Sequence, residues 1–179
     1  MKIIFTGAQG TGKTTILNHY KKQGYNIITE VVRNLSKEGV KINEMGDLDG
    51  QKRIFSEYRK TLNKEKSYIS DRGLTDVTAY TSYLGIKNDN LDLRLESLYQ
   101  LVDITEFYNN NTDVITCYFP IEFPVVDDGV RSINEEFRHD IDENIKNILD
   151  GIGIQYYTIT GTVEERIKQI DKIIQDVTL

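Results

Sequence analysis

The first fifteen residues contain a glycine-rich segment whose spacing suits phosphate binding. Residues 7–14 read Gly-Ala-Gln-Gly-Thr-Gly-Lys-Thr and match the pattern G-x-x-x-x-G-K-[ST]. Glycines let such a loop turn closely, so that its backbone N–H groups face phosphate oxygens. The helix expected to begin at Lys13 directs the positive end of its dipole toward the same anion. We therefore predict that nucleotide phosphates bind here, in contact with Gly7, Gln9, Gly10, Thr11, Gly12, Lys13, Thr14 and Thr15.

Two residues of this loop and one carboxylate elsewhere form a candidate site for metal binding and phosphoryl transfer. Lys13 supplies a mobile positive charge for the β- and γ-phosphates, and the Thr14 hydroxyl suits Mg²⁺. Phosphoryl transfer also requires a carboxylate near the metal, usually at the end of a neighbouring strand. Residues 68–70 read as a buried strand that Asp71 follows directly, so we predict that Thr14 and Asp71 bind the metal. The alternative is that Asp71 is a solvated loop residue.

An acceptor side is predicted from residues that follow the second strand. Residues 26–29 read as a strand, and Glu30 comes next, where the carboxyl edge of a parallel sheet faces a ligand crevice. Glu30 is suited to accept the proton of an acceptor hydroxyl, and Arg33 to bind an anionic group on the acceptor. The alternative is that Glu30 begins a helix, where the dipole favours it, and that Arg33 lies on the surface.

Aromatic and amide side chains supply candidates for recognition of a flat ring. Gln51, Phe55 and Tyr58 are spaced so that they share one helix face, and Tyr80 and Tyr83 lie on the helix after Asp71. A ring needs an apolar wall with one or two polar groups. Packing in the core is the alternative for each of these side chains.

A kinase also needs a cationic lid that excludes water. Two prolines after the fourth strand begin an irregular stretch, and we place the lid at about residues 125–140, with Arg131 and Arg138 as its phosphate-binding side chains. The alternative for both arginines is a solvated loop with surface ion pairs, and His139 is expected on the surface. The predicted catalytic residues are thus Lys13, Glu30, Asp71, Arg131 and Arg138.

The elements that position these residues alternate between strands and helices. Strands are predicted over residues 3–6, 26–29, 68–70, 114–119 and 155–159, and helices over residues 13–22, 48–63, 74–84, 91–107 and 135–149. The helix at 91–107 has Leu91, Leu95, Leu98 and Val102 on one face, and a last helix begins with the capping pair Thr162 and Glu165. This alternation predicts a single α/β domain over residues 1–179, with a parallel sheet covered on both faces.

Composition narrows the class of protein further. The chain has 179 residues and a net charge of −6, so bulk charge gives no sign of nucleic-acid binding. With Cys117 as its single cysteine it has no intrachain disulfide, and with two histidines a structural zinc site is not expected. Cys117 is predicted to be a buried, inert thiol. The start of the chain does not read as a signal peptide and no apolar run is long enough to span a membrane, so we expect a cytoplasmic protein.

Taken together, these motifs resemble a known group of enzymes. The loop at 7–14, Glu30-x-x-Arg33, Asp71-Arg72-Gly73 and Asp128-Gly129-Val130-Arg131 are similar to motifs of small P-loop kinases related to the nicotinamide riboside kinase domain, beside thymidylate and deoxynucleoside kinases. The resemblance implies a three-layer P-loop NTPase sandwich with strand order 2-3-1-4-5. It also implies adenine binding near Thr160-Gly161-Thr162, with Gly161 as the cofactor contact, and Arg72 near the acceptor. Gly73 stands where thymidylate kinases carry a tyrosine, which leaves the acceptor open.

Three functions are compatible with this sequence. The first is an ATP- and Mg²⁺-dependent kinase for the hydroxyl or phosphate of a nucleoside, nucleotide or related ribosylated molecule, with Glu30, Arg33, Gln51, Phe55, Arg72 and Tyr80 as substrate contacts. The second is a kinase of hydroxymethylated pyrimidines in DNA, as in related bacteriophage enzymes, which needs a basic channel from residues such as Lys37, Lys41, Lys52 and Arg53. The third is an ATP-driven switch without an acceptor. The base-reading motif of GTPases is missing. The protein is expected to be a monomer or a homodimer.

Overall fold

Five short strands lie side by side in one parallel sheet. They are β1 (Lys2–Thr6), β2 (Ile27–Ile28), β3 (Tyr68–Asp71), β4 (Val114–Tyr118) and β5 (Tyr156–Thr158). The computed structural model describes residues 1–124 and 134–178. The strands are ordered β2-β3-β1-β4-β5 and every pair is parallel, so the predicted fold class and strand order are confirmed.

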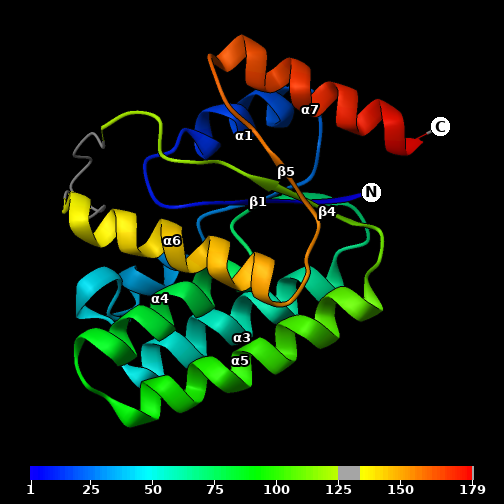
Figure 1. Cartoon of the computed structure of the whole chain (residues 1–179). Helices are drawn as coiled ribbons and strands as arrows, with labels where there is room; N and C mark the ends of the chain where they lie inside the picture. Colours follow the sequence, from blue (N-terminus) through cyan, green and yellow to red (C-terminus); the bar gives the residue numbers. More distant parts are fainter. Residues whose placement is uncertain (125–133, 179) are drawn as a thin grey trace.

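Helices cover both faces of the sheet (Figure 1). On one face lie α1 (Lys13–Lys22) and α7 (Val163–Thr178), and on the other lie α3 (Leu48–Lys64), α4 (Leu74–Lys87), α5 (Leu91–Asn110) and α6 (Glu135–Gly151). The short helix α2 (Val31–Lys37) and the 3-10 helix η1 (Asn43–Met45) connect β2 to α3. Side chains of β1 alternate between the two layers: Ile3 and Phe5 pack with α1 and α7, and Ile4 packs on the opposite face.

The register of the central strands places the candidate chemistry at one edge of the sheet. Phe5 of β1 pairs with Asp71 of β3 on one side and with Cys117 of β4 on the other. The Asp71 carboxylate therefore emerges beside the loop that follows β1. This edge holds the carboxyl ends of the strands, where ligands of open α/β sheets bind.

Several helix starts follow the capping rules expected from the sequence. Asp47, Asn90 and Asn134 cap α3, α5 and α6, accepting hydrogen bonds of 3.0, 3.0 and 3.1 Å from backbone N–H groups three residues on. At the start of α7, Thr162 N–H donates to Glu165 at 2.8 Å and Glu165 N–H donates to the Thr162 hydroxyl at 3.3 Å. The predicted capping box is confirmed.

The end of α4 differs from the prediction. The helix does not stop before Gly85 but continues to Lys87. Gly85 lies against α5, where a Cβ atom would approach the backbone nitrogen of Arg94 to 2.9 Å. The glycine therefore allows the two helices to pack closely and does not end the first one.

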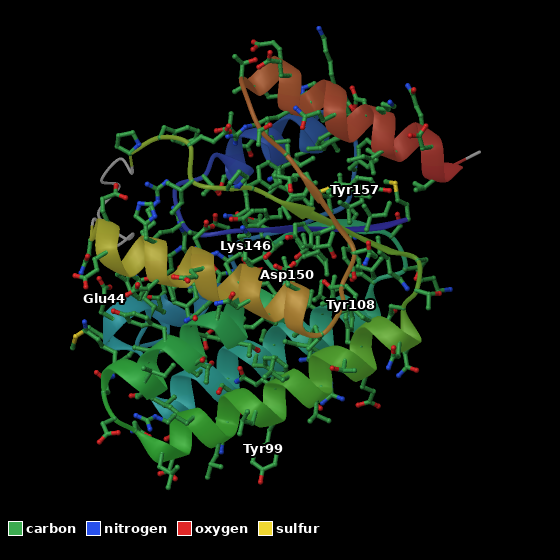
Figure 2. All side chains as sticks on the ribbon, in the orientation of Figure 1. Glu44, Tyr99, Tyr108, Lys146, Asp150 and Tyr157 are labelled. Atoms are coloured by element: carbon green, nitrogen blue, oxygen red, sulfur yellow. The ribbon has the colours of Figure 1, made fainter. Side chains whose placement is uncertain are left out.

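The predicted apolar face of α5 exists, but it lies on the outside of the molecule. Leu93, Gln100, Ile104 and Phe107 are on the buried face, whereas Leu91, Leu95, Leu98 and Val102 are exposed. Tyr99 of the same helix points away from the sheet (Figure 2). This helix thus has apolar side chains on both faces.

Cys117 is fully buried in β4, and burial raises the pKa of its thiol to about 12. The prediction of an inert thiol agrees with this environment. Within residues 1–124 and 134–178, none of the helices combines the length and the hydrophobicity needed to cross a bilayer.

Candidate active site

The loop between β1 and α1 adopts a conformation that requires glycine at its ends. Gly7 has a φ of 137°, and a Cβ atom there would collide with the Phe119 carbonyl oxygen. Gly12 has a φ of 86°, and a Cβ atom there would lie 3.0 Å from a guanidinium nitrogen of Arg166. Both values belong to the left-handed region that favours glycine. The strand–loop–helix context that the motif requires is therefore present.

Lys13, at the first position of α1, folds back over this loop. Its ammonium group donates to the carbonyl oxygens of Gly7 and Ala8, each at 2.7 Å, and to the Thr11 hydroxyl at 3.0 Å. Burial lowers the pKa of Lys13 to about 8, although the Asp71 carboxylate opposes this shift. The predicted phosphate-binding cation is thus held at the loop by hydrogen bonds that a bound phosphate would replace.

Thr14 and Asp71 lie together, as predicted. The Thr14 hydroxyl donates to a carboxylate oxygen of Asp71 at 3.2 Å, and both residues line the cleft described below. A hydroxyl and a carboxylate oxygen at this separation suit Mg²⁺, which uses one or two protein oxygens and takes its other ligands from water and phosphate. No group of three or more acidic, histidine or cysteine side chains suited to a metal occurs within the described ranges.

Asp76 is a functional candidate that the sequence did not reveal. Its two carboxylate oxygens accept hydrogen bonds from Gly7 N–H at 3.1 Å and from Gly73 N–H at 2.9 Å. The side chain is almost completely buried, and burial raises its pKa against the opposing charges of Lys13 and Arg72. Asp76 therefore connects the first glycine of the loop to the start of α4. Its only signal in the sequence is a position in the first turn of a helix.

Arg138 of α6 is buried behind the loop. Its guanidinium donates to the carbonyl oxygens of Gln9 at 2.9 Å, Gly10 at 3.2 Å and Phe123 at 2.9 Å, and pairs with Glu135 at 3.0 Å. The side chain has no exposed surface and does not line the cleft. In this structure Arg138 supports the loop backbone and does not face the cleft, so the predicted phosphate contact is not seen.

Arg166 of α7 also donates to the backbone of the phosphate loop, from the opposite face of the sheet. It donates to the Thr11 carbonyl oxygen at 2.6 Å and to the Gly161 carbonyl oxygen at 2.9 Å, and it pairs with Glu122. Its guanidinium also lies over the rings of Phe119 and Phe123, with distances of 5.7 and 5.4 Å to their centroids. Arg166 was not among the predicted residues.

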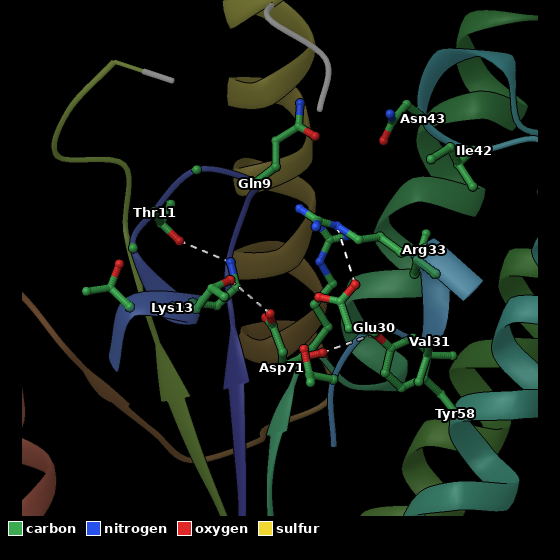
Figure 3. Close-up of a pocket in the computed structure, with 17 residues that line it drawn as sticks. Gln9, Thr11, Lys13, Glu30, Val31, Arg33, Ile42, Asn43, Tyr58 and Asp71 are labelled. Atoms are coloured by element: carbon green, nitrogen blue, oxygen red, sulfur yellow. Dashed lines mark hydrogen bonds and ion pairs between the residues drawn. The ribbon is translucent and has the colours of Figure 1, made fainter. Parts of the chain in front are cut away.

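A cleft of about 840 Å³, open to solvent, begins at this loop and extends to α2 and η1 (Figure 3). Figure 3 shows Lys13 and Asp71 on one side and Ile42 with Asn43 on the other, with Glu30 between them. Among the predicted residues, the cleft is lined by Gln9, Gly10, Thr11, Gly12, Lys13, Thr14, Thr15, Glu30, Arg33, Tyr58, Asp71 and Arg72.

Three lining residues adopt a backbone conformation that is costly for residues other than glycine. Glu30, Asn43 and Arg72 have φ values of 65°, 53° and 76°, in the left-handed region. Such strain costs about 1–3 kcal/mol per residue and gathers at functional sites. Among the described residues, only Asp89 shares this conformation outside the cleft. Glu30 also forms an exposed ion pair with Arg33 at 3.7 Å.

A second, much smaller pocket, called the second cavity below, adjoins the cleft and is partly open to solvent. The two share Val32, Ile42, Asn43 and Arg72 as lining residues, and the cavity is completed by Gln51, Ile54, Val77 and Tyr80. The Gln51 amide is oriented by the Thr81 hydroxyl, which donates to its oxygen at 3.1 Å. The Arg72 guanidinium lies 5.4 Å from the centroid of the Tyr80 ring. Three predicted acceptor residues are therefore gathered in one cavity.

The remaining predicted residues lie elsewhere. Phe55 packs in the hydrophobic core and lines neither cavity. Gly161, with a φ of 94°, donates its N–H to Glu122 at 3.0 Å and is connected to the phosphate loop by Arg166. Arg131 and the Asp-Gly-x-Arg stretch, which form most of the predicted lid, lie outside the described residues.

The basic residues considered for a DNA channel are mostly paired with carboxylates. Lys41 contacts Asp47 at 3.0 Å, and Lys52 contacts Glu96 at 3.6 Å. Arg53 pairs with Glu38. These pairs neutralise much of the charge on which phosphate-backbone binding depends.

Comparisons with solved structures identify proteins of the same fold. Deoxyadenosine kinase from M. mycoides, solved with the product dCMP and a flexible dCDP bound, has a TM-score of 0.70 and 19% identity, over 99% of this chain and 100% of that chain. The same kinase with dATP gives a TM-score of 0.64 and 20% identity, over 98% and 100%. The NadR protein in complex with NR has a TM-score of 0.70 and 18% identity, and the match covers 99% of this chain and 52% of that chain. The resemblance inferred from the motifs is thus confirmed at the level of the fold.

No curated protein matches the chain in sequence. A family model described as an AAA domain matches residues 2–166, which is nearly the whole chain. The match includes the phosphate loop, Asp71 and the second cavity. The chain therefore belongs to the AAA domain family.

Proposed function

We propose that the protein is a kinase that uses ATP and Mg²⁺ to phosphorylate a hydroxyl group of a nucleoside or a nucleoside-like molecule. The observation that carries this proposal is the junction of two cavities. A cleft that begins at a phosphate loop adjoins a smaller pocket with apolar walls. Val32, which lies two residues after Glu30, lines both pockets, and Glu30 lines the cleft. A switch ATPase needs the first cavity but has no use for the second.

The donor side would bind the triphosphate. Backbone N–H groups of the loop and the Lys13 ammonium would neutralise its charge. Thr14 and Asp71 would hold Mg²⁺, which supplies charge neutralisation at the phosphates when bound. Arg138 and Arg166 add two buried positive charges directly behind the loop.

The acceptor side would bind a flat ring with few polar groups. Val32, Ile54 and Val77 provide apolar walls. The Tyr80 hydroxyl is buried and makes no hydrogen bond of normal geometry within the described part of the chain. Burial raises the pKa of Tyr80 against the opposing effect of Arg72, so the hydroxyl is protonated at neutral pH. A buried polar group without a partner is costly, which favours a site built for a polar edge of the acceptor.

Glu30 would act on the hydroxyl that is phosphorylated. The acceptor oxygen would form a bond to the γ-phosphorus, while the bond from that phosphorus to the β–γ bridging oxygen breaks. The hydroxyl proton would pass to the Glu30 carboxylate. The left-handed backbone of Glu30 fixes this side chain at the mouth of the cleft.

The related structures support the same choice of acceptor. The M. mycoides protein is a deoxyadenosine kinase, and the NadR protein was solved with NR. The two alternative functions receive less support. The pairing of Lys41, Lys52 and Arg53 with carboxylates disfavours DNA as the acceptor, and the second cavity disfavours an acceptor-free switch.

The decisive experiment is a screen of ATP consumption with free nucleosides, nucleoside monophosphates, nicotinamide riboside and hydroxymethylated DNA as acceptors. The proposal predicts turnover that depends on a free nucleoside-like acceptor. ATP hydrolysis that is indifferent to every acceptor would contradict it, as would stimulation by the modified DNA alone. The Lys13→Ala variant should fold normally but lose turnover, which excludes a contaminating kinase.

A further inference from the structure

Asp76 is a buried carboxylate that the proposed reaction leaves without a role. It lies in the first turn of α4 and is 1% exposed. Its two oxygens accept hydrogen bonds from different segments, one from Gly7 N–H at 3.1 Å and the other from Gly73 N–H at 2.9 Å. Capping of α4 explains only the contact to Gly73, because an acidic residue at this position commonly accepts from the N-cap N–H. The contact to Gly7 spans 69 residues of sequence and requires a different explanation.

The first of these contacts fixes the start of the phosphate loop. Asp76 accepts the N–H of Gly7, while the Lys13 ammonium donates to the carbonyl oxygen of the same residue at 2.7 Å. A bound phosphate would draw Lys13 away from this carbonyl, whereas the contact to Asp76 can persist. The start of the loop is therefore tied to α4, which covers the opposite face of the sheet from α1 (Figure 1).

The second contact holds the turn that carries Arg72. The backbone of Arg72 has a φ of 76°, a conformation that persists only when its surroundings enforce it. Its N–H donates to the Phe5 carbonyl oxygen at 2.8 Å, and its carbonyl oxygen accepts from the Ser70 hydroxyl at 2.7 Å. The next N–H along the chain, that of Gly73, is the one that Asp76 accepts. The backbone that presents Arg72 to both cavities is thus fixed on each side of the residue.

The charges that act on Asp76 come from the same two parts of the site. A buried carboxylate is costly unless opposite charges lie near it. The cations that act on Asp76 are Lys13, on the donor side, and Arg72, on the acceptor side. One carboxylate therefore holds the backbone of both sides and interacts with the cation of each.

Transfer in line requires that the γ-phosphate and the acceptor hydroxyl are held at a fixed separation, and a misplacement of about 1 Å can cost about 100-fold in rate. We propose that Asp76 is the positioning residue that sets this separation, because it ties the phosphate loop to the turn of Arg72. This role rests on the kinase function proposed above. It implies that Asp76 affects the transfer step far more than the binding of either substrate alone.

The test measures turnover and binding separately in variants of the full chain. The Asp76→Asn side chain has the same size but only one oxygen, so one of the two N–H donors, on Gly7 or on Gly73, meets an amide NH₂ group instead. With ATP and the free nucleoside that gives the highest turnover in the acceptor screen, kcat should fall about 100-fold. The affinity for a non-hydrolysable ATP analogue with Mg²⁺, and the KM for the nucleoside, should each change by less than about threefold.

A second variant, Asp76→Glu, distinguishes positioning from capping. Glutamate is a common acceptor at this position of a capping box, so the variant keeps both the charge and the start of α4. Its extra methylene group displaces the oxygen that accepts from Gly7. We expect a folded protein by circular dichroism whose kcat is at least about tenfold lower. A residue that only caps the helix would keep its kcat after this change.

The control variant is Thr78→Val on the same helix. Thr78 is completely buried, and its hydroxyl donates to Gln100 of α5 at 3.0 Å, so this variant should lose stability but retain kcat. Equal kcat values in Asp76→Asn and Thr78→Val would overturn the proposal. Loss of the fold in both Asp76 variants would also overturn it, because the role would then be purely structural. A wild type that phosphorylates no free nucleoside would overturn the proposed function itself, and the role of Asp76 with it.

Discussion

Arg138 and Arg166 donate hydrogen bonds to adjacent peptide carbonyls of the phosphate loop from opposite faces of the sheet. Arg138 contacts the Gly10 carbonyl oxygen at 3.2 Å, and Arg166 contacts the Thr11 carbonyl oxygen at 2.6 Å. Both guanidinium groups are buried. Because these carbonyls are directed toward the arginines, the N–H groups of the same loop remain available to a phosphate. Side chains from both faces of the sheet thus fix the backbone conformation of the loop.

The first prediction concerns Arg166. The Arg166→Met change removes a charged hydrogen-bond donor and leaves Glu122 without its cation, so we expect a loss of about 2–4 kcal/mol in the free energy of unfolding. Affinity for MgATP should fall at least about tenfold, because the loop is no longer ordered in advance. Denaturant unfolding and calorimetric titration measure the two effects.

The matched control is Arg59→Met, which removes partly exposed ion pairs with Asp103 and Glu106, away from the loop. Exposed pairs contribute about 0–1 kcal/mol, so this variant should retain both stability and affinity. Equal effects of the two substitutions would show that Arg166 has no special role at the loop.

Sequence reasoning located the residues that line the cleft better than the residues that support the loop behind it. The phosphate loop and Asp71 were predictable because each is a short motif at a strand end. Arg166 and Asp76 were not, since their contacts to the loop span 155 and 69 residues of sequence and depend on the packing of α7 and α4. The end of α4 at residue 84 was predicted wrongly for a related reason. Gly85 allows close contact between α4 and α5 and does not end the helix in a local turn.

The second prediction concerns pH and Lys13. The pKa of Lys13 is lowered to about 8 in the unliganded protein, whereas a bound triphosphate requires the ammonium form. Above pH 8, binding must therefore take up a proton, and the affinity for MgATP should fall by up to about tenfold per pH unit. Titration calorimetry in buffers of different ionisation enthalpy measures both the affinity and the proton uptake.

The Lys13→Arg variant is the control, because a guanidinium does not titrate in this range. If Lys13 causes the pH dependence, the affinity of the Lys13→Arg variant for MgATP should be lower than that of the wild type but independent of pH between 8 and 9.5.

The ionisation of Lys13 gives an opposite trend in stability. Between about pH 8 and the ordinary value of 10.5, the unfolded chain binds more protons, so the free energy of unfolding should rise with pH.

The third prediction assigns the acceptor proton to Glu30. The Glu30→Gln change keeps the shape of the side chain but removes the base, so turnover should fall by about 10²–10⁴-fold. Binding of MgATP should be unaffected within about twofold, because the acceptor side is separate from the loop. Glu38→Gln, at a carboxylate paired with Arg53 away from the cleft, should change neither quantity. Parallel losses of turnover and ATP binding in Glu30→Gln would instead indicate a role on the donor side.

The last prediction uses the Tyr80 hydroxyl, which lines the second cavity without a hydrogen bond of normal geometry to the described residues. The Tyr80→Phe change removes a buried hydroxyl whose charged neighbour is the Arg72 guanidinium, and it keeps the ring on which that guanidinium lies, so stability should change by no more than about 1 kcal/mol. The KM for the acceptor should nevertheless rise by about tenfold, since the hydroxyl is the partner of a polar group on the ligand. Tyr118→Phe provides the contrast: its hydroxyl donates to Asp142 at 2.7 Å, so that variant should lose about 1–2 kcal/mol in stability and keep its KM. If Tyr80→Phe instead behaves as Tyr118→Phe does, the hydroxyl is a structural group and the second cavity does not recognise the acceptor through it.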